Sequence, residues 1–222
     1  MDSQMKNDLE KLSKKGVLFS DIDKVEIRGK LTCGEKVEIG TNIIFEGDIV
    51  LGDNVKLDSN IIITSSTVGD HCHIKSFSSI KKSIIGKSCI VGPFARLRTD
   101  SRIGDFSQIG NFVEIKNSVL GEHCRVNHMA FLGDCKLGKD VTIGAGTITC
   151  NHDGHKTNET IIESVVYVGS NVNLVAPIKI SANATIGSGS TITSDVPEGK
   201  LTLSRSRQTT IQNWKGPRSK SK

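Results

Sequence analysis

The sequence predicts an all-β fold, a β-helix built of hexapeptide repeats, and three observations point to it. Aliphatic residues recur every five or six positions over most of the 222 residues, and many are followed directly by glycine, as at Leu51-Gly52 and Ile143-Gly144. Aromatic residues make up only 4% of the chain, so the core must consist of thin side chains that stack on one another. A six-residue period fits neither one face of a helix nor simple strand alternation, and it is typical of a hexapeptide β-helix.

Residues 1–24 precede the repeat and are expected to form a cap and lead-in. Met5, Leu9 and Leu12 are spaced at i, i+4 and i+7, and Gly16 follows, which predicts a short amphipathic helix. We expect its apolar side to cover the first coil, because the open end of a β-helix must be protected. The charged N-terminus does not resemble a signal peptide, and no stretch approaches the roughly 18 apolar residues of a membrane span. A cytoplasmic location is expected.

Residues 25–196 are expected to form the β-helix, with three hexads in each triangular coil. At about 18 residues per coil this predicts about nine or ten coils, or ~45 Å of stacked strands. The aliphatic residues that point inward are Leu51, Leu57, Ile63, Val68, Ile74, Ile80, Ile85, Val91, Leu97, Ile103, Ile109, Ile115, Leu120, Val126, Leu132, Leu137, Ile143, Val168, Leu174, Ile180, Ile186 and Ile192. A second inward position follows four residues later and must be small, as at Val55, Ala95, Ser107, Val113, Ala130, Val141, Thr147, Ala184 and Ser190.

Three of the six cysteines, Cys72, Cys89 and Cys124, occupy this small inward position. The neighbouring His71, His73 and His123 suggest zinc as an alternative. However, the chain has no Cys-x-x-Cys pair, and a cysteine in that position is best interpreted as a small buried side chain. We therefore expect the three histidines to face outward and expect no metal site.

The repeat fails between Ile148 and Ile161, where the chain reads TCNHDGHKTNET. This segment predicts a loop, residues 149–160, extruded from the β-helix. Irregular loops on a regular scaffold often carry function.

Residues 197–222 are expected to form an irregular, basic C-terminal arm. Of the net charge of +5, the segment 205–222 contributes +6 with no acidic residue, so the remainder carries −1. The body therefore lacks the basic face expected of a nucleic-acid-binding protein. The arm either holds a small polyanion or is a solvated terminus.

His128 lies two residues after the inward Val126, so we expect it at an outward corner rather than in the core. A metal ligand and a catalytic base both remain possible from this position alone.

Six motifs, in order, resemble the acetyltransferase domain of the bifunctional GlmU family. They are GPFARLR (92–98), GNFVEIK (110–116), NHMAFLGD (127–134), IGAGTITCNHDG (143–154), VGSNVNLVAPI (168–178) and SRSRQ (204–208). GlmU proteins are glucosamine-1-phosphate N-acetyltransferases and N-acetylglucosamine-1-phosphate uridylyltransferases. The resemblance runs from about residue 5 to the tail. No glycine-rich loop of a uridylyltransferase half is present in this sequence, so we expect a free-standing acetyltransferase or a fragment of a longer chain.

The resemblance implies a left-handed β-helix, a homotrimer and an active site between subunits. It implies transfer of an acetyl group from acetyl-CoA, a cosubstrate, to glucosamine 1-phosphate, a step toward UDP-N-acetylglucosamine, peptidoglycan and lipopolysaccharide. His128 matches the general base. Residues at substrate-binding positions are Arg98, Lys116, Phe131, Thr142 and Asn151. Residues at coenzyme-binding positions are Ala145, Asn151, His152, Ser170, Ser188 and Arg205.

These residue types suit acetyl transfer to an amine. An amine attacks a thioester in its neutral form, and an imidazole with an unperturbed pKa of ~6.5 can accept the proton. Arg98 and Lys116 suit a sugar phosphate, although without the resemblance ordinary solvent-facing charge would be the better interpretation of both. Backbone N–H groups at coil corners are candidate donors to the oxyanion.

Three positions depart from the family pattern. Phe131 replaces the usual tyrosine, Thr142 replaces an asparagine, and Thr157 stands where a loop lysine is expected, with Lys156 beside it. They leave open an acetyltransferase for another amino sugar or nucleotide sugar. A non-catalytic trimeric scaffold is a further alternative. Zinc chemistry of the gamma-class carbonic anhydrase type is disfavoured, because Gly133 stands where the pattern resembling G-H-x4-H needs its second histidine.

Overall fold

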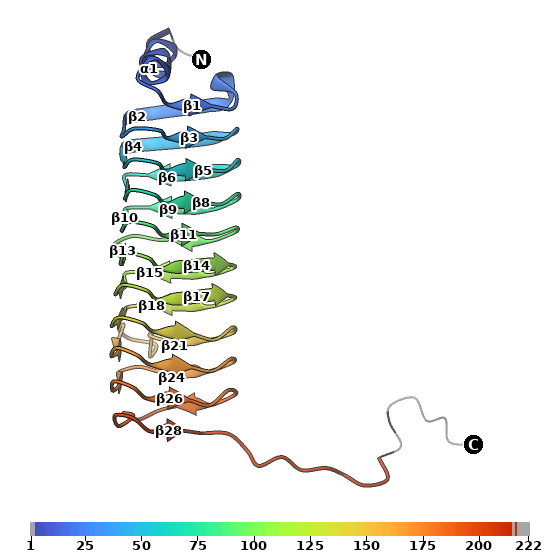
Figure 1. Cartoon of the computed structure of the whole chain (residues 1–222). Helices are drawn as coiled ribbons and strands as arrows, with labels where there is room; N and C mark the ends of the chain where they lie inside the picture. Colours follow the sequence, from blue (N-terminus) through green and yellow to red (C-terminus); the bar gives the residue numbers. More distant parts are fainter. Residues whose placement is uncertain (1–2, 215, 217–222) are drawn as a thin grey trace, which may run out of the picture.

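A computed structural model describes residues 3–214 and 216 of the chain. The strands stack as rungs in a tall column, with the helix α1 (Ser3–Lys14) at one end and the C-terminal segment leaving the other end (Figure 1). Every pairing between the strands is parallel. The fold is a left-handed parallel β-helix, as the repeat and the resemblance predict.

One face of the column is a single eleven-stranded sheet, here called the first sheet. Its strands are β1 (Leu18–Phe19), β3 (Glu38–Ile39), β5 (Lys56–Leu57), β8 (His73–Ile74), β11 (Ile90–Val91), β14 (Gln108–Asn111), β17 (Arg125–His128), β20 (Thr142–Ile143), β23 (Tyr167–Val168), β26 (Thr185–Ile186) and β28 (Leu201–Thr202).

The other two faces share a seventeen-stranded sheet. The nine-residue strands β2 (Val25–Cys33) and β4 (Ile43–Leu51) join these faces, since β4 pairs with both β6 (Ile61–Thr64) and β7 (Thr67–Val68). The second face continues with β9 (Ser79–Lys81), β12 (Arg96–Leu97), β15 (Glu114–Lys116), β18 (Phe131–Gly133), β21 (Ile148–Cys150), β24 (Asn173–Val175) and β27 (Thr191–Ile192). The third face continues with β10 (Ser83–Ile85), β13 (Ser101–Ile103), β16 (Val119–Leu120), β19 (Cys135–Leu137), β22 (Thr160–Ile162) and β25 (Ile178–Ile180).

The strand register shows how successive coils align. Val91 pairs with Ile109, and Val126 pairs with Ile143, so the inward residue of each coil lies against its equivalent in the next. The coil between Ile143 and its partner Val168 is longer than its neighbours, because it contains the segment between β21 and β22. That segment projects from the column as an exposed loop, in which only His152 and Thr157 form an isolated bridge, as the break in the repeat predicts.

The core confirms the predicted hexapeptide pattern. Every aliphatic residue of the predicted inward series is at most 5% exposed. The predicted small positions are buried as well, and their polar members are satisfied within the core. The hydroxyl of Ser107 donates to the Gly121 carbonyl at 3.1 Å, and that of Thr147 donates to the Gly169 carbonyl at 3.2 Å.

Corners of the triangle place residues in the left-handed backbone region. His71 and His123 both have φ of 58° and are exposed, and His73 is half-buried against Asp58, 2.9 Å away. Cys72, Cys89 and Cys124 point inward and are at most 1% exposed. Burial raises the pKa of the Cys124 thiol to about 11, so it is held as the neutral form that suits a packed side chain. The prediction that these histidines face outward and these cysteines inward is confirmed.

Both ends of the column differ from its middle. Leu9 of α1 is fully buried, and Leu12 packs against the core beside it, so the helix covers the first coil. The side chain of Met5 lies outside the described part. At the other end the chain leaves the column after β28, and Ile211 and Trp214 are exposed (Figure 1). Of the basic arm, Arg205 and Arg207 are described, while Lys215, Arg218, Lys220 and Lys222 lie outside the described residues. No helix within residues 3–214 is long and apolar enough to cross a membrane.

Replacing Ile109, which is 0% exposed, with alanine is expected to lower the free energy of unfolding by about 2–5 kcal/mol, because it removes buried methyl groups and leaves a cavity. The same change at its exposed neighbour Gln108 should have an effect within about 0.5 kcal/mol. Chemical denaturation of the two variants measures both. Equal effects would contradict the inward assignment of the series.

Candidate active site

His128 is the last residue of β17 and its side chain is exposed at the edge where the first sheet meets the second face. Asn111, the last residue of β14, lies directly against it in the strand register. Its Oδ1 is 2.7 Å from His128 Nδ1. An amide oxygen only accepts, so Nδ1 carries the hydrogen and Nε2 is left with a free lone pair. When the imidazole is neutral, this contact leaves the Nε2 lone pair free to accept a proton.

A shallow cavity of about 340 Å³ opens beside this pair. It is lined by Lys75, Ile90, Gly92, Pro93, Gln108, Ile109, Gly110, Asn111, Asn127 and His128. Glycine is required at position 110, because a Cβ there would collide with the backbone carbonyl of Asn127 in the next coil. The two coils are therefore close enough for Asn111 to reach the imidazole.

Further predicted site residues lie on the same edge as His128, in successive coils. Because Val126, Ile143, Val168 and Ile186 are in register, the residues two positions after them form a row. We call this row, Asn111, His128, Ala145, Ser170 and Ser188, the His128 edge. Hydrogen bonds between neighbours support it: Ser170 N–H donates to Ser188 Oγ at 3.1 Å. The side chains that follow His128 along the edge are small, which leaves a path for a ligand.

Arg205 closes the far end of this path. Its Nη1 donates to the backbone carbonyl of Ser188 at 3.0 Å, and the rest of the exposed side chain faces solvent. A cation at this position suits the phosphates of a long ligand that lies along the edge.

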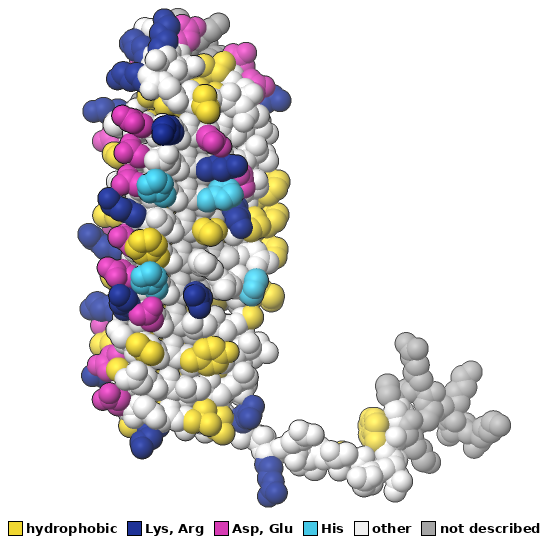
Figure 2. Space-filling view, viewed as in Figure 1, with side chains coloured by type: hydrophobic (Ala, Val, Ile, Leu, Met, Phe, Trp, Pro, Cys, Tyr) yellow, Lys and Arg dark blue, Asp and Glu magenta, His cyan; other side chains and the backbone are white. Residues whose placement is uncertain are grey.

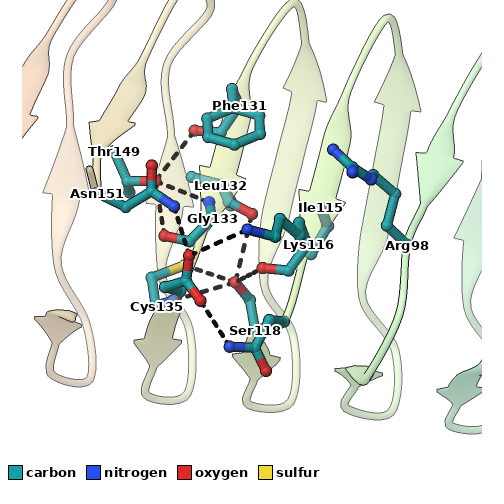
Figure 3. Close-up of polar contacts among 12 residues, drawn as sticks. Arg98, Ile115, Lys116, Ser118, Phe131, Leu132, Gly133, Cys135, Thr149 and Asn151 are labelled. Atoms are coloured by element: carbon teal, nitrogen blue, oxygen red, sulfur yellow. Dashed lines mark hydrogen bonds and ion pairs between the residues drawn. The ribbon is translucent and has the colours of Figure 1, made fainter. Parts of the chain in front are cut away.

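A second group lies at the opposite edge of the second face, which we call the Lys116 edge. It comprises the predicted residues Arg98, Lys116 and Asn151, together with Asp134. Arg98 Nη1 is 2.7 Å from Glu114 Oε1. Lys116 Nζ is 3.7 Å from Asp134 Oδ2 and its side chain is 35% exposed. Lys116 and Asn151 belong to one polar network, and Arg98 lies apart from it (Figure 3).

Asp134 accepts hydrogen bonds from Asn117 Nδ2 at 2.6 Å and from Asn151 Nδ2. Partial burial would raise the pKa of this carboxyl, but the two amide donors and the charge of Lys116 outweigh it and hold the pKa below its usual value. The group is therefore an anion at neutral pH.

The extruded loop folds around the carboxylate of one of its own residues, Asp153. The carboxylate of Asp153 accepts from the backbone N–H of His155 and of Lys156, each at 2.9 Å, and from Asn158 Nδ2 at 2.9 Å. These hydrogen bonds lower the pKa of Asp153 well below its usual value. His152 Nδ1 accepts from Gly154 N–H at 3.1 Å. The loop therefore presents a defined shape rather than an open strand.

The three positions that depart from the family pattern lie around these two edges. Phe131 is half-buried on β18 in the second face, between the His128 and Lys116 edges. Thr142 is half-buried on β20 in the first sheet, and Thr157 is exposed in the loop, paired with His152.

One chain does not bring all the predicted residues together. His128, Ala145, Ser170, Ser188 and Arg205 share one edge, whereas Arg98, Lys116, Asn151 and His152 lie at the other end of the second face. Sequence reasoning missed two members of the arrangement, Asn111 and Asp134. The coil period offered a signal for both, since Asn111 stands one coil before His128 and Asp134 stands one coil after Asn117.

Within residues 3–214 and 216, no group of three or more His, Cys, Asp and Glu side chains is placed to hold a metal ion. The polar groups of both edges are engaged with one another or open to solvent.

Replacing Asn111 with alanine removes the acceptor for the Nδ1 hydrogen of His128. Neutral histidine in water favours the hydrogen on Nε2, so we expect the His128 tautomer to shift from Nδ1–H toward Nε2–H. Nitrogen NMR shifts of His128 at a pH of about 8.5, where an unperturbed imidazole is neutral, measure this ratio. An unchanged ratio would mean that the 2.7 Å contact does not set the tautomer.

Sequence comparisons relate the chain to known families. A family model for the GMPPB C-terminal domain matches residues 27–135. The chain is 48% identical over 207 residues to bifunctional protein GlmU of Nitrosomonas eutropha, covering 93% of this chain and 45% of that protein. It is 44% identical over 206 residues to GlmU of Janthinobacterium sp., covering 93% of this chain and 46% of that protein. The chain thus spans about half the length of the curated relatives it matches.

A structural comparison bears on the fold. A solved UDP-N-acetylglucosamine acyltransferase from Arabidopsis superposes with a TM-score of 0.60 at 18% identity, covering 80% of this chain and 70% of that chain. At this identity the likeness shows a shared fold. The sequence matches confirm the resemblance that the motifs predict: over nearly its whole length, the chain is homologous to the C-terminal, hexapeptide-repeat part of the bifunctional GlmU proteins.

Proposed function

We propose that this chain is an N-acetyltransferase that transfers the acetyl group of acetyl-CoA to the amine of glucosamine 1-phosphate. The product, N-acetylglucosamine 1-phosphate, is a precursor of UDP-N-acetylglucosamine and so of cell-envelope polysaccharides. The homology to GlmU supports the reaction class. The observation that carries the proposal is the His128 edge, where an oriented imidazole stands at the head of a path of small side chains that ends at Arg205.

The proposed chemistry follows from the tautomer. The neutral amine attacks the thioester carbonyl while Nε2 of His128 accepts the proton that the nitrogen sheds, and Nδ1 keeps its hydrogen bond to Asn111. The imidazolium that forms is stabilised because Asn111 Oδ1 still faces Nδ1–H. Collapse of the tetrahedral intermediate breaks the carbon–sulfur bond, releases the CoA thiolate and leaves the amide. Acetyl-CoA would lie along Ala145, Ser170 and Ser188, with its phosphates near Arg205.

The acceptor would be held by the Lys116 edge of a second chain. Arg98 and Lys116 supply two cations for the sugar phosphate, and Asn151 and His152 bring the loop to the coenzyme. Because these groups and His128 lie at different edges of one chain, the site would be complete only where two chains meet, and a homotrimer provides three such seams.

An exposed apolar row beside the His128 edge supports contact between chains: the rings of Phe77 and Phe94 stack at 4.9 Å, and those of Phe94 and Phe112 at 5.3 Å. Exposed hydrophobic side chains lie among the charged side chains on the surface of the column (Figure 2).

Two positions bear on the choice of acceptor. Phe131 has no hydroxyl to offer a sugar phosphate, and Thr142 is shorter than asparagine. Another amino sugar or nucleotide sugar is therefore the second candidate. We also propose a cytoplasmic location, because that compartment supplies acetyl-CoA. We consider a non-catalytic scaffold the weaker alternative, because it would not explain why His128 and Arg205 lie along one edge.

Replacing His128 with alanine should lower turnover by about 10²–10⁴-fold, the usual contribution of a general base. Release of the CoA thiol from acetyl-CoA in the presence of glucosamine 1-phosphate measures it. His123→Ala is the matched control, because His123 is an exposed corner histidine whose ring stacks on Phe106 at another edge. If the wild type shows no preference for glucosamine 1-phosphate over other amino sugars, the second candidate replaces the first. A wild-type chain that acetylates none of these amino sugars would favour the non-catalytic scaffold.

Coexpression of two variants with reduced activity tests the seam between chains. A mixed trimer of His128→Ala and Lys116→Ala chains should recover part of the activity, because some seams would combine an intact His128 edge with an intact Lys116 edge. A mixed trimer of His128→Ala and Arg205→Ala chains should recover none, since both residues must come from the same chain. Mixed trimers are purified through two different affinity tags, and thiol release is measured. Equal recovery from the two mixtures would rule out a site divided in this way.

A further inference from the structure

We propose that Asp134 is a positioning residue that fixes Lys116 and the extruded loop relative to each other, so that the sugar-phosphate group and the coenzyme loop are held as one unit. This inference rests on the proposed function for its kinetic part. Asp134 itself would touch neither substrate and would act through the two side chains that it holds.

The side chain of Asp134 contacts three other side chains. Oδ1 accepts from Asn117 Nδ2 at 2.6 Å, within the coil that carries Lys116. Oδ2 accepts from Asn151 Nδ2 and is 3.7 Å from Lys116 Nζ. One carboxylate oxygen is therefore shared by the proposed phosphate-binding lysine and the proposed loop contact. Figure 3 shows Lys116 and Asn151 drawn together in this network.

The backbone of Asp134 makes the same two connections. Its N–H donates to the Lys116 carbonyl at 3.0 Å, and its carbonyl accepts from Thr160 N–H at 3.1 Å, where the chain returns from the loop. The Asn151 carbonyl in turn accepts from Asn158 N–H at 2.7 Å, which closes the loop from its other end. Asp134 thus contacts the start of the loop through its side chain and the end through its backbone.

The surroundings of Asp134 suit this role. Only 12% of its side chain is exposed, compared with 35% for Lys116, so the carboxylate lies behind the lysine and leaves the ammonium group accessible. Gly133 beside it provides room, because a Cβ there would come within 2.8 Å of Asn151 Nδ2 and of the Phe131 ring. A cavity of about 240 Å³ lies between this carboxylate and loop residues Thr157 and Asn158. Other contacts hold the two ends of the loop: Thr149 Oγ1 accepts from Gly133 N–H at 2.7 Å, and Lys136 Nζ is 2.8 Å from Glu159 Oε1.

The charge of Asp134 also determines how firmly Lys116 is held. A single carboxylate at 3.7 Å orients the ammonium group without closing a short ion pair, so the lysine keeps donors free for a phosphate. An amide in place of the carboxylate would remove the charge and could no longer offer acceptors to both Asn117 and Asn151.

Asp134→Asn is the test variant. Asp134 has φ of 50°, a backbone region in which asparagine is common, so the change does not strain the corner. Asp140→Asn is the matched control, because Asp140 has φ of 58° and is exposed, and its side chain forms no hydrogen bond or ion pair with the described residues. We expect Asp134→Asn to raise the KM for both glucosamine 1-phosphate and acetyl-CoA and to lower kcat/KM by about 10- to 100-fold, the effect of losing hydrogen bonds to a charged group.

A double-mutant cycle separates positioning from a general loss of stability. In a Lys116→Ala background, Asp134→Asn should no longer change the KM for glucosamine 1-phosphate, and in an Asn151→Ala background it should no longer change the KM for acetyl-CoA. Fully additive losses, or wild-type KM values for both substrates in the single variant, would overturn the inference.

Hydrogen exchange provides a measurement that needs no turnover. Asp134→Asn should speed exchange of the Asn158 amide, whose partner is the Asn151 carbonyl, at least about 10-fold relative to wild type and to Asp140→Asn. An unchanged rate would refute the positioning of the loop. Faster exchange in a chain that acetylates no amino sugar would uphold the connection between Asp134 and the loop while refuting the proposed function.

Discussion

The stacking of inward aliphatic side chains is the constraint on which the rest of this structure depends. Each coil buries one such residue per face directly against its equivalents in the neighbouring coils, as Ile109, Val126 and Ile143 do. Slipping one coil by a single residue would turn this side chain to solvent. The register is therefore fixed along the whole column. Residues far apart in the sequence, such as His128 and Ser188, then share an edge by necessity.

Such a scaffold creates sites at its edges rather than in a pocket. The faces are regular strands, and the corners hold the residues whose side chains are free to project. The His128 and Lys116 edges lie at the two ends of the second face, so neither encloses a ligand by itself. Under the proposed function, a second chain set against the His128 edge would supply the missing wall of the shallow cavity beside His128.

Much of the fold followed from the sequence because the hexapeptide signal repeats so many times. The buried series, the inward cysteines and the loop at the break in the repeat were each predictable from spacing. The side-chain partners were not. That Asn111 meets His128, or that Asn151 and Lys116 converge on Asp134, depends on which rotamers the corners allow, and the period says only that these residues are neighbours. The separation of the predicted site into two edges was present in the hexad count, because Ile115 before Lys116 and Val126 before His128 are two hexads apart.

The long coil between Ile143 and Val168 shows how the column accommodates an insertion. The strands on both sides of the loop keep their pairing, with Cys135 against Thr160 and Leu137 against Ile162. The excursion therefore costs the stack nothing in alignment, and its length and composition are released from the demands of the core. Residues 152–157 are exposed, so natural selection or a protein engineer can replace them without disturbing the core. If the proposed function holds, a new ligand preference could arise there while the column keeps its architecture.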